Sequence, residues 1–329
     1  MGKRKLGNSD LFVHSIGLGC MGFSHASGDP VDNQTAVKTL RQAFEMGYDF
    51  FDTAEAYTGL FPDGSVSYNE ELVGKALHNV RDKVVIATKM GVGHHADRSL
   101  RLDSSPQTIR KSLEGSLEKL GTDYVDLYYQ HRIDPKVEPE VVAETMKQLI
   151  KEGKIHYWGI SETTEEYLRR ANAVCPVTAI ENRYSMMARW HETLFPVCEE
   201  LNIAYVAFSP MANGFLTGKY TPDTKFEGKQ DYRAGMPQYT EEGYEKAKDL
   251  LALLTDMAEE KHAAMGQISL AWMLCKKPYI VAIPGSRKPE RLRENFEAGN
   301  IILAPEEISM IDSKLETMQF EVFGGHSAK

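Results

Sequence analysis

Residues 84–89 read Val84-Val85-Ile86-Ala87-Thr88-Lys89, a short apolar run of the kind that forms a buried strand. The next clear pattern covers residues 107–120, where apolar side chains recur at helical spacing between Ser105-Pro106 and Gly121. A second apolar run follows at once, Val125-Asp126-Leu127-Tyr128-Tyr129. A strand, a helix and another strand in this order predict neighbouring parallel strands with a helix packed over them.

The same alternation continues along almost all of the 329 residues, with further amphipathic segments at 35–46 and 140–151. Eight strands, each followed by a helix, predict an α/β fold, a (β/α)8 barrel that forms a single domain over residues 1–329. An open, doubly wound sheet is the alternative, but even spacing without a break in composition favours closure. The candidate strands are residues 14–19, 48–52, 84–89, 125–129, 157–160, 177–180, 204–208 and 280–283.

Some segments interrupt this regular pattern. Residues 3–13 precede the first strand and predict a hairpin around Gly7-Asn8 that covers the bottom of the barrel. Residues 213–240 are too long and irregular for a plain connection, and such a loop at the carboxyl edge of a barrel strand usually serves the substrate or cofactor. Residues 324–329 predict a flexible tail.

The composition excludes several classes of protein. With 42% hydrophobic and 26% charged residues the chain resembles an ordinary globular protein, and its net charge of -9 argues against broad binding to nucleic acid or an anionic membrane. No apolar run approaches the ~20 residues of a membrane span, and none of the signal type follows the basic start. Cys20, Cys175, Cys198 and Cys275 are far apart and form no metal-type cluster. We therefore expect a cytoplasmic protein with reduced thiols and no metal site.

Four polar residues stand at or just beyond the ends of predicted strands, namely Asp52, Tyr57, Lys89 and His131. The carboxyl ends of barrel strands meet on one face, so these side chains are predicted to converge there. A free tyrosine has a pKa of about 10, and a nearby ammonium lowers this pKa by stabilising the phenolate. Tyr57 would then donate a proton to a carbonyl while Lys89 tunes its pKa. Asp52 would orient Lys89, and His131 would position the carbonyl.

The strings that contain these residues resemble the aldo-keto reductase family. They are Phe50-Phe51-Asp52-Thr53-Ala54-Glu55-Ala56-Tyr57, Ala87-Thr88-Lys89 and Tyr129-Gln130-His131, in the family's order. The resemblance extends from Gly17 to Asn295. It implies a (β/α)8 barrel that reduces aldehydes or ketones with NADPH, with Tyr57 as the general acid.

One stretch of the sequence matches a dinucleotide-binding motif but lacks the surrounding features that this motif requires. Gly17-Leu18-Gly19-Cys20-Met21-Gly22 matches GxGxxG, but it leads into a polar loop rather than a helix. An acidic residue about 20 positions further on is also missing, since position 42 is Gln. We interpret the segment as a first barrel strand whose glycines let the backbone approach a bound ring. A Rossmann dehydrogenase would instead place the cofactor here.

Residues 283–295 are the stronger candidate for the adenosine end of the cofactor. They follow the last strand and lead into a helix whose N-terminus would face a phosphate. Arg287, Lys288 and Arg291 concentrate positive charge in an acidic protein, which favours the 2′-phosphate of NADPH over the bare ribose of NADH.

The resemblance assigns further contacts to the cofactor. Ser161 matches the serine that binds the nicotinamide carboxamide, Tyr184 resembles the aromatic residue that stacks on the ring, and residues 209–218 resemble the pyrophosphate loop. The predicted cofactor contacts are Met21, Gly22, Asp52, Ser161, Glu181, Tyr184, Ser209, Met211, Asn213, Leu216, Gly218, Gly285, Ser286, Arg287, Arg291, Glu294 and Asn295.

Some positions depart from the commoner family pattern. Glu162 stands where many members carry Asn, Glu181 where Gln is usual, and Arg183 where Glu is frequent. A carboxylate at position 181 adds negative charge near the nicotinamide ring. We hypothesise that it stabilises the oxidised, cationic ring relative to the reduced one, unless Arg183 neutralises it.

The sequence thus predicts an NADPH-dependent reductase of a small-molecule carbonyl substrate. A cofactor-binding regulatory subunit of a membrane channel is the alternative, because some relatives of the family keep the barrel with little turnover. The lack of a long extra N-terminal segment disfavours it. The sequence contains no pattern that identifies the substrate or the oligomeric state.

Overall fold

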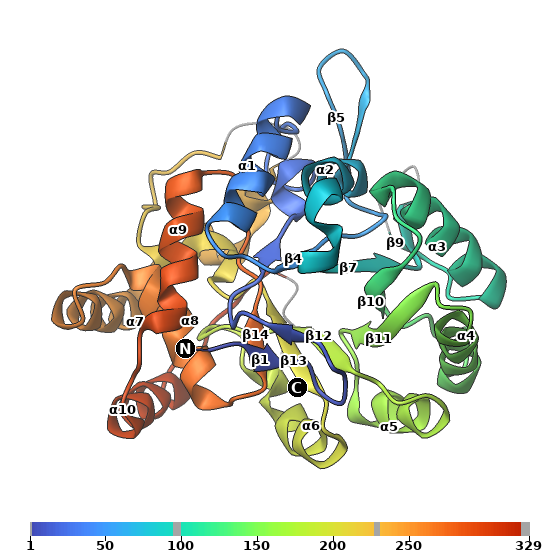
Figure 1. Cartoon of the computed structure of the whole chain (residues 1–329). Helices are drawn as coiled ribbons and strands as arrows, with labels where there is room; N and C mark the ends of the chain where they lie inside the picture. Colours follow the sequence, from blue (N-terminus) through green and yellow to red (C-terminus); the bar gives the residue numbers. More distant parts are fainter. Residues whose placement is uncertain (1, 95–99, 227–230, 324–329) are drawn as a thin grey trace.

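A ring of eight parallel strands surrounded by helices organises the computed structural model of this chain, which describes residues 2–94, 100–226 and 231–323 (Figure 1). Each strand forms hydrogen bonds with the next one along the chain. In this order they are β3 (Leu18–Gly19), β4 (Phe50–Asp52), β7 (Val85–Met90), β10 (Val125–Gln130), β11 (Ile155–Ser161), β12 (Ala179–Arg183), β13 (Ala204–Phe208) and β14 (Ile280–Ala282).

The first and last strands also meet, and this contact closes the barrel. Ile16 forms a parallel bridge with Ala282, and the backbone N of Gly17 donates to the carbonyl O of Ala282 at 2.8 Å. The predicted (β/α)8 barrel is therefore confirmed, and the open sheet is wrong. β12 extends past the predicted end at residue 180 to Arg183, because its polar residues pair in register with β13.

The helices cover the outer face of the barrel, as Figure 1 shows. Their ends follow local sequence signals: Ser105 accepts a hydrogen bond from the backbone N of Thr108 at the start of one helix, and Gly121 ends it with φ 63°. The helices are α1 (Asn33–Glu45), α2 (Asn69–Leu77), α3 (Pro106–Leu120), α4 (Pro139–Lys151), α5 (Glu165–Val174), α6 (Phe195–Leu201), α7 (Glu241–Glu260), α8 (Met265–Lys276), α9 (Pro289–Glu297) and α10 (Pro305–Glu316).

A hairpin of β1 (Arg4–Lys5) and β2 (Phe12–Val13) closes the end of the barrel where the strands begin. Leu6 and Val13 are fully buried in the same cluster as Phe50 and Leu127 from the barrel interior. At the turn, Gly7 has φ 52°, and a Cβ there would lie 2.2 Å from the carbonyl O of Thr178. The hairpin therefore presses its backbone against the barrel, and the opposite end remains available for a site.

The long segment at 213–240 is folded rather than extended. Its described part contains the short helices η4 (Ala212–Thr217), η5 (Tyr232–Gly235) and η6 (Pro237–Tyr239). Asp231 forms a bridge with Ser27, and the backbone N of Tyr232 donates to Ala26 O at 3.2 Å. The segment thus reaches the loop that follows β3.

The remaining elements are smaller. Two antiparallel hairpins pair β5 (Thr58–Leu60) with β6 (Val66–Tyr68) and β8 (Val92–His94) with β9 (Leu100–Leu102), and further 3-10 turns are η1 (Met21–Phe23), η2 (His78–Lys83), η3 (Trp190–Leu194) and η7 (Ala298–Asn300). The predicted tail at 324–329 lies outside the described residues. Among those that are described, no helix is long and apolar enough to cross a bilayer.

The burial of Leu6 predicts that the hairpin stabilises the whole barrel. Leu6→Ala should lower the free energy of unfolding by about 2–5 kcal/mol, because it leaves a cavity against the barrel interior. Leu60→Ala is the matched control, since Leu60 is 55% exposed and its loss should change the free energy by less than about 0.5 kcal/mol. Urea denaturation of both variants measures the difference. Equal effects would show that the hairpin is not part of the core.

Candidate active site

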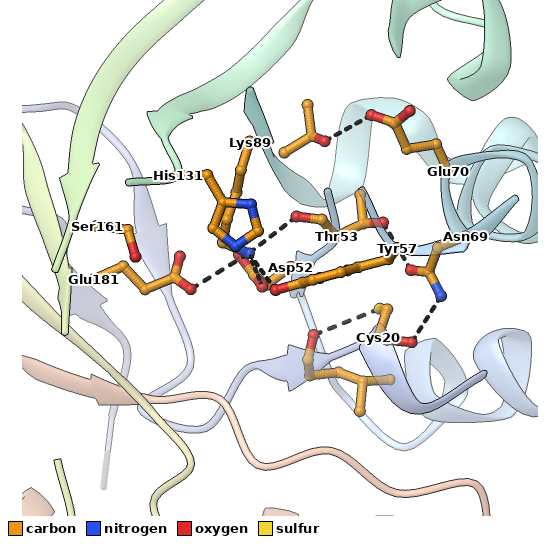
Figure 2. A network of polar contacts seen from close by, with 12 residues as sticks. Cys20, Asp52, Thr53, Tyr57, Asn69, Glu70, Lys89, His131, Ser161 and Glu181 are labelled. Carbon is orange, nitrogen blue, oxygen red and sulfur yellow. Dashed lines mark hydrogen bonds and ion pairs between the residues drawn. The ribbon is translucent and has the colours of Figure 1, made fainter. Parts of the chain in front are cut away.

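The four residues at the strand ends come together around the ammonium group of Lys89 (Figure 2). Lys89 on β7 donates a hydrogen bond to the Asp52 carboxylate on β4, and its Nζ lies 3.0 Å from Thr53 O and 3.4 Å from the Tyr57 hydroxyl. Lys89 is fully buried, and Asp52 is nearly so. The parallel register of β4 and β7 produces this arrangement, because Asp52 pairs with Ala87, two residues before Lys89.

The charge of Lys89 is held by its neighbours. Burial alone would lower the pKa of this lysine, but Asp52, Glu181 and Tyr57 together raise it above its ordinary value. Lys89 therefore stays an ammonium at every physiological pH. A buried ammonium of this kind requires a partner of opposite charge, which is the role predicted for Asp52.

Glu181 on β12 adds a second carboxyl group to this cluster. Its Oε1 lies 3.3 Å from Lys89 Nζ, and its side chain also contacts the carboxyl group of Asp52. Burial, followed by the charge of Asp52, raises the pKa of Glu181 to about 8. With a pKa above neutral, Glu181 is mostly protonated at pH 7.

The protonated state of Glu181 corrects the charge hypothesis made from the sequence. At neutral pH this side chain is mostly protonated, so it adds little negative charge beside a nicotinamide ring, and the raised pKa argues against the premise of that hypothesis. The cation that acts on Glu181 is Lys89, whose charge lowers the pKa of Glu181. Arg183 is not among the main influences on this pKa. A protonated Glu can also donate a hydrogen bond, as the amide of the usual Gln does.

The pKa of Tyr57 moves in the direction opposite to the prediction. Burial of the hydroxyl raises this pKa to about 12, while Lys89 opposes the shift as predicted, and Asp52 and Glu181 add to it. The sequence shows the ammonium but not the depth of the hydroxyl group or the second carboxyl. Tyr57 is therefore a neutral phenol at physiological pH, the form that can donate a proton.

His131 lies beside Tyr57 at the end of β10. The two rings make an edge-to-face contact with their centres 5.6 Å apart, and the backbone N of His131 donates to Met90 O at 3.0 Å. Ser161, on the next strand, lies close to Glu181 in Figure 2. The imidazole and the phenol thus face the same side of the site.

Asn69 holds the loop of Tyr57 in place, a role that no pattern in the sequence predicts. Its side chain accepts from Thr53 Oγ1 at 2.7 Å and donates to Cys20 O at 2.9 Å and to Ser24 Oγ at 2.8 Å. Its backbone N donates to the carbonyl O of Tyr57 at 3.1 Å. Asn69 opens α2 with no pattern that separates it from an ordinary helix start, so only the fold reveals its contacts.

Two glycines of the GxGxxG string, Gly17 and Gly19, lie against neighbouring parts of the barrel. A Cβ at Gly17 would lie 2.6 Å from the Phe50 ring, and one at Gly19 would lie 2.7 Å from Ile283 O. These contacts alone account for glycine at both positions, and the approach of the backbone to a bound ring stays a prediction. Met21 and Gly22 follow in η1 and are partly exposed.

The segment after β13 has an unusual backbone. Several residues here have positive φ angles although they carry side chains, a costly conformation that clusters at ligand-binding segments. The φ angles are 50° at Ser209, 48° at Ala212, 60° at Asn213, 99° at Gly214 and 66° at Gly218. Met211 and Leu216 of the predicted contacts are buried here.

The predicted adenosine segment runs from the end of β14 into α9. Arg287 is partly exposed and donates to Asp29 O at 3.2 Å, while Arg291 forms an ion pair with Glu294. Gly285 is exposed and Ser286 partly exposed, whereas Asn295 is 4% exposed within α9. The cations therefore stand at the start of this helix, as the pattern predicts.

Tyr184 cannot stack on a ring at this face. It is fully buried, and its ring packs against Trp272, Phe195 and Tyr205. The aromatic residue at the strand ends is instead Phe208, which is partly exposed at the end of β13. The prediction for Tyr184 failed because spacing alone does not tell an inward-facing residue from an outward-facing one.

Comparisons with known proteins identify the family of this chain. The sequence profile of the Aldo/keto reductase family matches residues 15–316. A probable aldo-keto reductase 1 of Glycine max is 35% identical over 309 residues, which cover 93% of this chain and 87% of the relative. An aldo-keto reductase of Strobilurus tenacellus is 34% identical over 99% of this chain and 95% of its own.

Solved structures show the same similarity. A glycerol dehydrogenase of Gluconobacter oxydans superposes with a TM-score of 0.85 at 26% identity, covering 99% of both chains. An aldo/keto reductase of Klebsiella pneumoniae in complex with NADP and acetate gives a TM-score of 0.72 at 25% identity, covering 98% of this chain and 99% of the other.

The contacts of Asn69 predict a role in positioning Tyr57. If Tyr57 is the proton donor, as the sequence predicts, Asn69→Ala should reduce kcat/KM for carbonyl reduction by roughly tenfold to hundredfold, because a small displacement of Tyr57 would misalign the reaction. Asn79→Ala is the control, since Asn79 is exposed in η2. Steady-state kinetics with a saturating cofactor measure both. Unchanged kinetics in a folded Asn69→Ala variant would contradict this role.

The raised pKa of Glu181 predicts how stability varies with pH. Between about pH 5 and 8 the folded chain keeps a proton that the unfolded chain has lost, so stability falls as pH rises through this range. Glu181→Gln removes this contribution and should gain stability relative to the parent protein toward pH 8.5. Urea denaturation at pH 5.5, 7.0 and 8.5 tests it, with the exposed Glu166→Gln as control. A difference that is constant with pH would exclude a protonated Glu181.

Proposed function

The chain belongs to the aldo-keto reductase family and is an NADP-dependent oxidoreductase, and on this premise we propose that it reduces the carbonyl group of a small aldehyde or ketone to an alcohol. The observation that carries the proposal is the contact of Lys89 with both Asp52 and the Tyr57 hydroxyl, with His131 beside the same phenol. These groups match the needs of proton donation to a carbonyl.

The residues present fit NADPH. The left-handed backbone of residues 209–218 suits a diphosphate, and the cations Arg287, Lys288 and Arg291 at the start of α9 suit the phosphate on the adenosine ribose. Ser161 and the protonated Glu181 would hold the nicotinamide carboxamide. Phe208, rather than Tyr184, is the aromatic residue available to contact the ring.

When bound, NADPH supplies a hydride, which brings two electrons to the carbonyl carbon. Tyr57 donates its hydroxyl proton to the carbonyl oxygen as that oxygen gains negative charge. Lys89 stabilises the phenolate that remains, and the phenolate then recovers a proton from solvent. His131 donates a hydrogen bond to the carbonyl oxygen and so keeps it in reach of Tyr57.

Removal of the hydroxyl group tests the role of Tyr57. Tyr57→Phe should lower kcat for reduction of small aldehydes by about 10²–10⁴-fold, because it deletes the proposed general acid. The Kd of NADPH, followed by its fluorescence, should stay within about threefold. Tyr68→Phe is the matched control, since Tyr68 is 37% exposed, and its kinetics should not change.

The other outcomes are equally informative. Normal turnover by Tyr57→Phe would show that another group donates the proton. A single stoichiometric turnover by the parent protein, without steady-state reduction of any aldehyde, dicarbonyl or ketone, would favour a regulatory subunit that binds the cofactor.

A further inference from the structure

Two arginines lie together near the proposed site. Arg132 directly follows His131, and Arg183 is the last residue of β12. Their guanidinium carbons lie 5.8 Å and 5.0 Å from the centre of the Phe208 ring. Arg183 also pairs in register with Phe208, which ends β13. Both cations therefore stand where the strands end. This is the same face of the barrel that carries Asp52, Tyr57, Lys89 and His131.

Arg183 is buried and makes no direct ion pair in the part of the chain that the structure describes. Only 8% of the residue is exposed, and its Nε has no hydrogen-bond partner. Burial lowers the pKa of Arg183 to about 10, so the group is still charged at neutral pH. A site that keeps a buried, unpaired charge is a candidate for a ligand of opposite charge.

One carboxylate, that of Glu162, lies near the two arginines, and its single negative charge cannot neutralise both of them. Glu162 acts on both through space, but its Oε1 accepts from the backbone N of Arg183 at 2.8 Å and lies 3.7 Å from His191 Nε2. Lys89, Asp52 and Glu181 together have no net charge when Glu181 is protonated. One positive charge thus lacks a counter-charge among these groups.

Arg132 places this charge next to the reacting carbonyl. Its Nη1 donates to His131 O at 2.6 Å and to Ser161 Oγ at 3.1 Å. The cofactor phosphates have their own groups elsewhere, in residues 209–218 and in the cations at the start of α9. The anion that fits here is therefore carried by the molecule whose carbonyl lies between His131 and Tyr57.

We propose that Arg132 and Arg183 bind an acidic group of the substrate, so that the preferred substrates are small aldehydes or ketones that also carry a carboxylate. This inference rests on the proposed carbonyl reduction. A carboxylate matches a guanidinium fork in shape and charge, and binding it would supply the direct ion pair that Arg183 lacks. The two arginines would thereby select acids over neutral carbonyl compounds of the same size.

A matched pair of substrates tests this selection. In 4-carboxybenzaldehyde and 4-nitrobenzaldehyde the group opposite the aldehyde has the same planar shape, but only the first is an anion. Arg183→Met should lower kcat/KM for the acid by about tenfold to hundredfold, the usual size for a hydrogen bond to a charged group, and change it less than threefold for the nitro compound. Arg183→Lys should recover part of the loss.

Binding of a non-reacting acid gives a second readout. Calorimetric titration of the NADP-loaded protein with benzoate should give a Kd at least tenfold lower in the parent protein than in Arg183→Met, whereas the Kd of benzamide should not differ. Arg110→Met, which removes a surface arginine on α3 paired with Glu152, should leave both values unchanged. Thermal unfolding confirms that the variants are folded.

The outcomes separate the possible sources of the anion. Equal loss for both aldehydes, together with weaker NADPH binding by Arg183→Met, would assign the arginines to the cofactor diphosphate and overturn the proposal. Benzoate binding that does not depend on Arg183 would also overturn it. If benzoate binds as expected but no carbonyl compound is reduced, the anion site stands and the proposed reduction fails.

Discussion

A fully buried ammonium group sets the conditions for everything around it. Lys89 has left water, so its charge must be matched by the protein, and Asp52 supplies the match through a direct hydrogen bond. Glu181 would add an excess negative charge if it were ionised, and its raised pKa keeps it mostly protonated at neutral pH. The charge balance leaves Lys89 in contact with the Tyr57 hydroxyl, at 3.4 Å, while the phenol keeps its proton.

The barrel surrounds this charged cluster with packed side chains, and its loops hold the members of the cluster in position. The N-terminal hairpin closes the lower end with Leu6 and Val13, so buried apolar side chains fill the interior beneath the ammonium. On the other end, Asn69 ties the loops after β3 and β4 to the start of α2. The arrangement of Asp52, Tyr57, Lys89 and His131 therefore depends on the whole barrel, because each of these residues comes from a different strand end or loop.

Two positions that differ from the common family pattern have complementary effects on charge. Position 181 carries a carboxyl that the cluster keeps mostly neutral, whereas position 183 carries a cation that makes no direct ion pair with its described neighbours. The alternation of side chains along a strand explains why residues two apart face the same interior. The centre of the site is neutral, and its rim by Phe208 is positive. Such a division suits a substrate with an uncharged reacting carbonyl and an acidic group at some distance from it.

The sequence by itself determined the closed barrel, the strand ends that carry Asp52, Lys89 and His131, and the cations that precede α9, because periodic apolar patterns and their end residues are local signals. Only the tertiary structure decided which aromatic ring reaches the open face, what Asn69 holds, and the directions in which the pKa values of Tyr57 and Glu181 move. These properties depend on burial and on contacts between residues far apart in the chain. A spacing pattern contains neither, since desolvation and the distance between two charges exist only after the strands have closed.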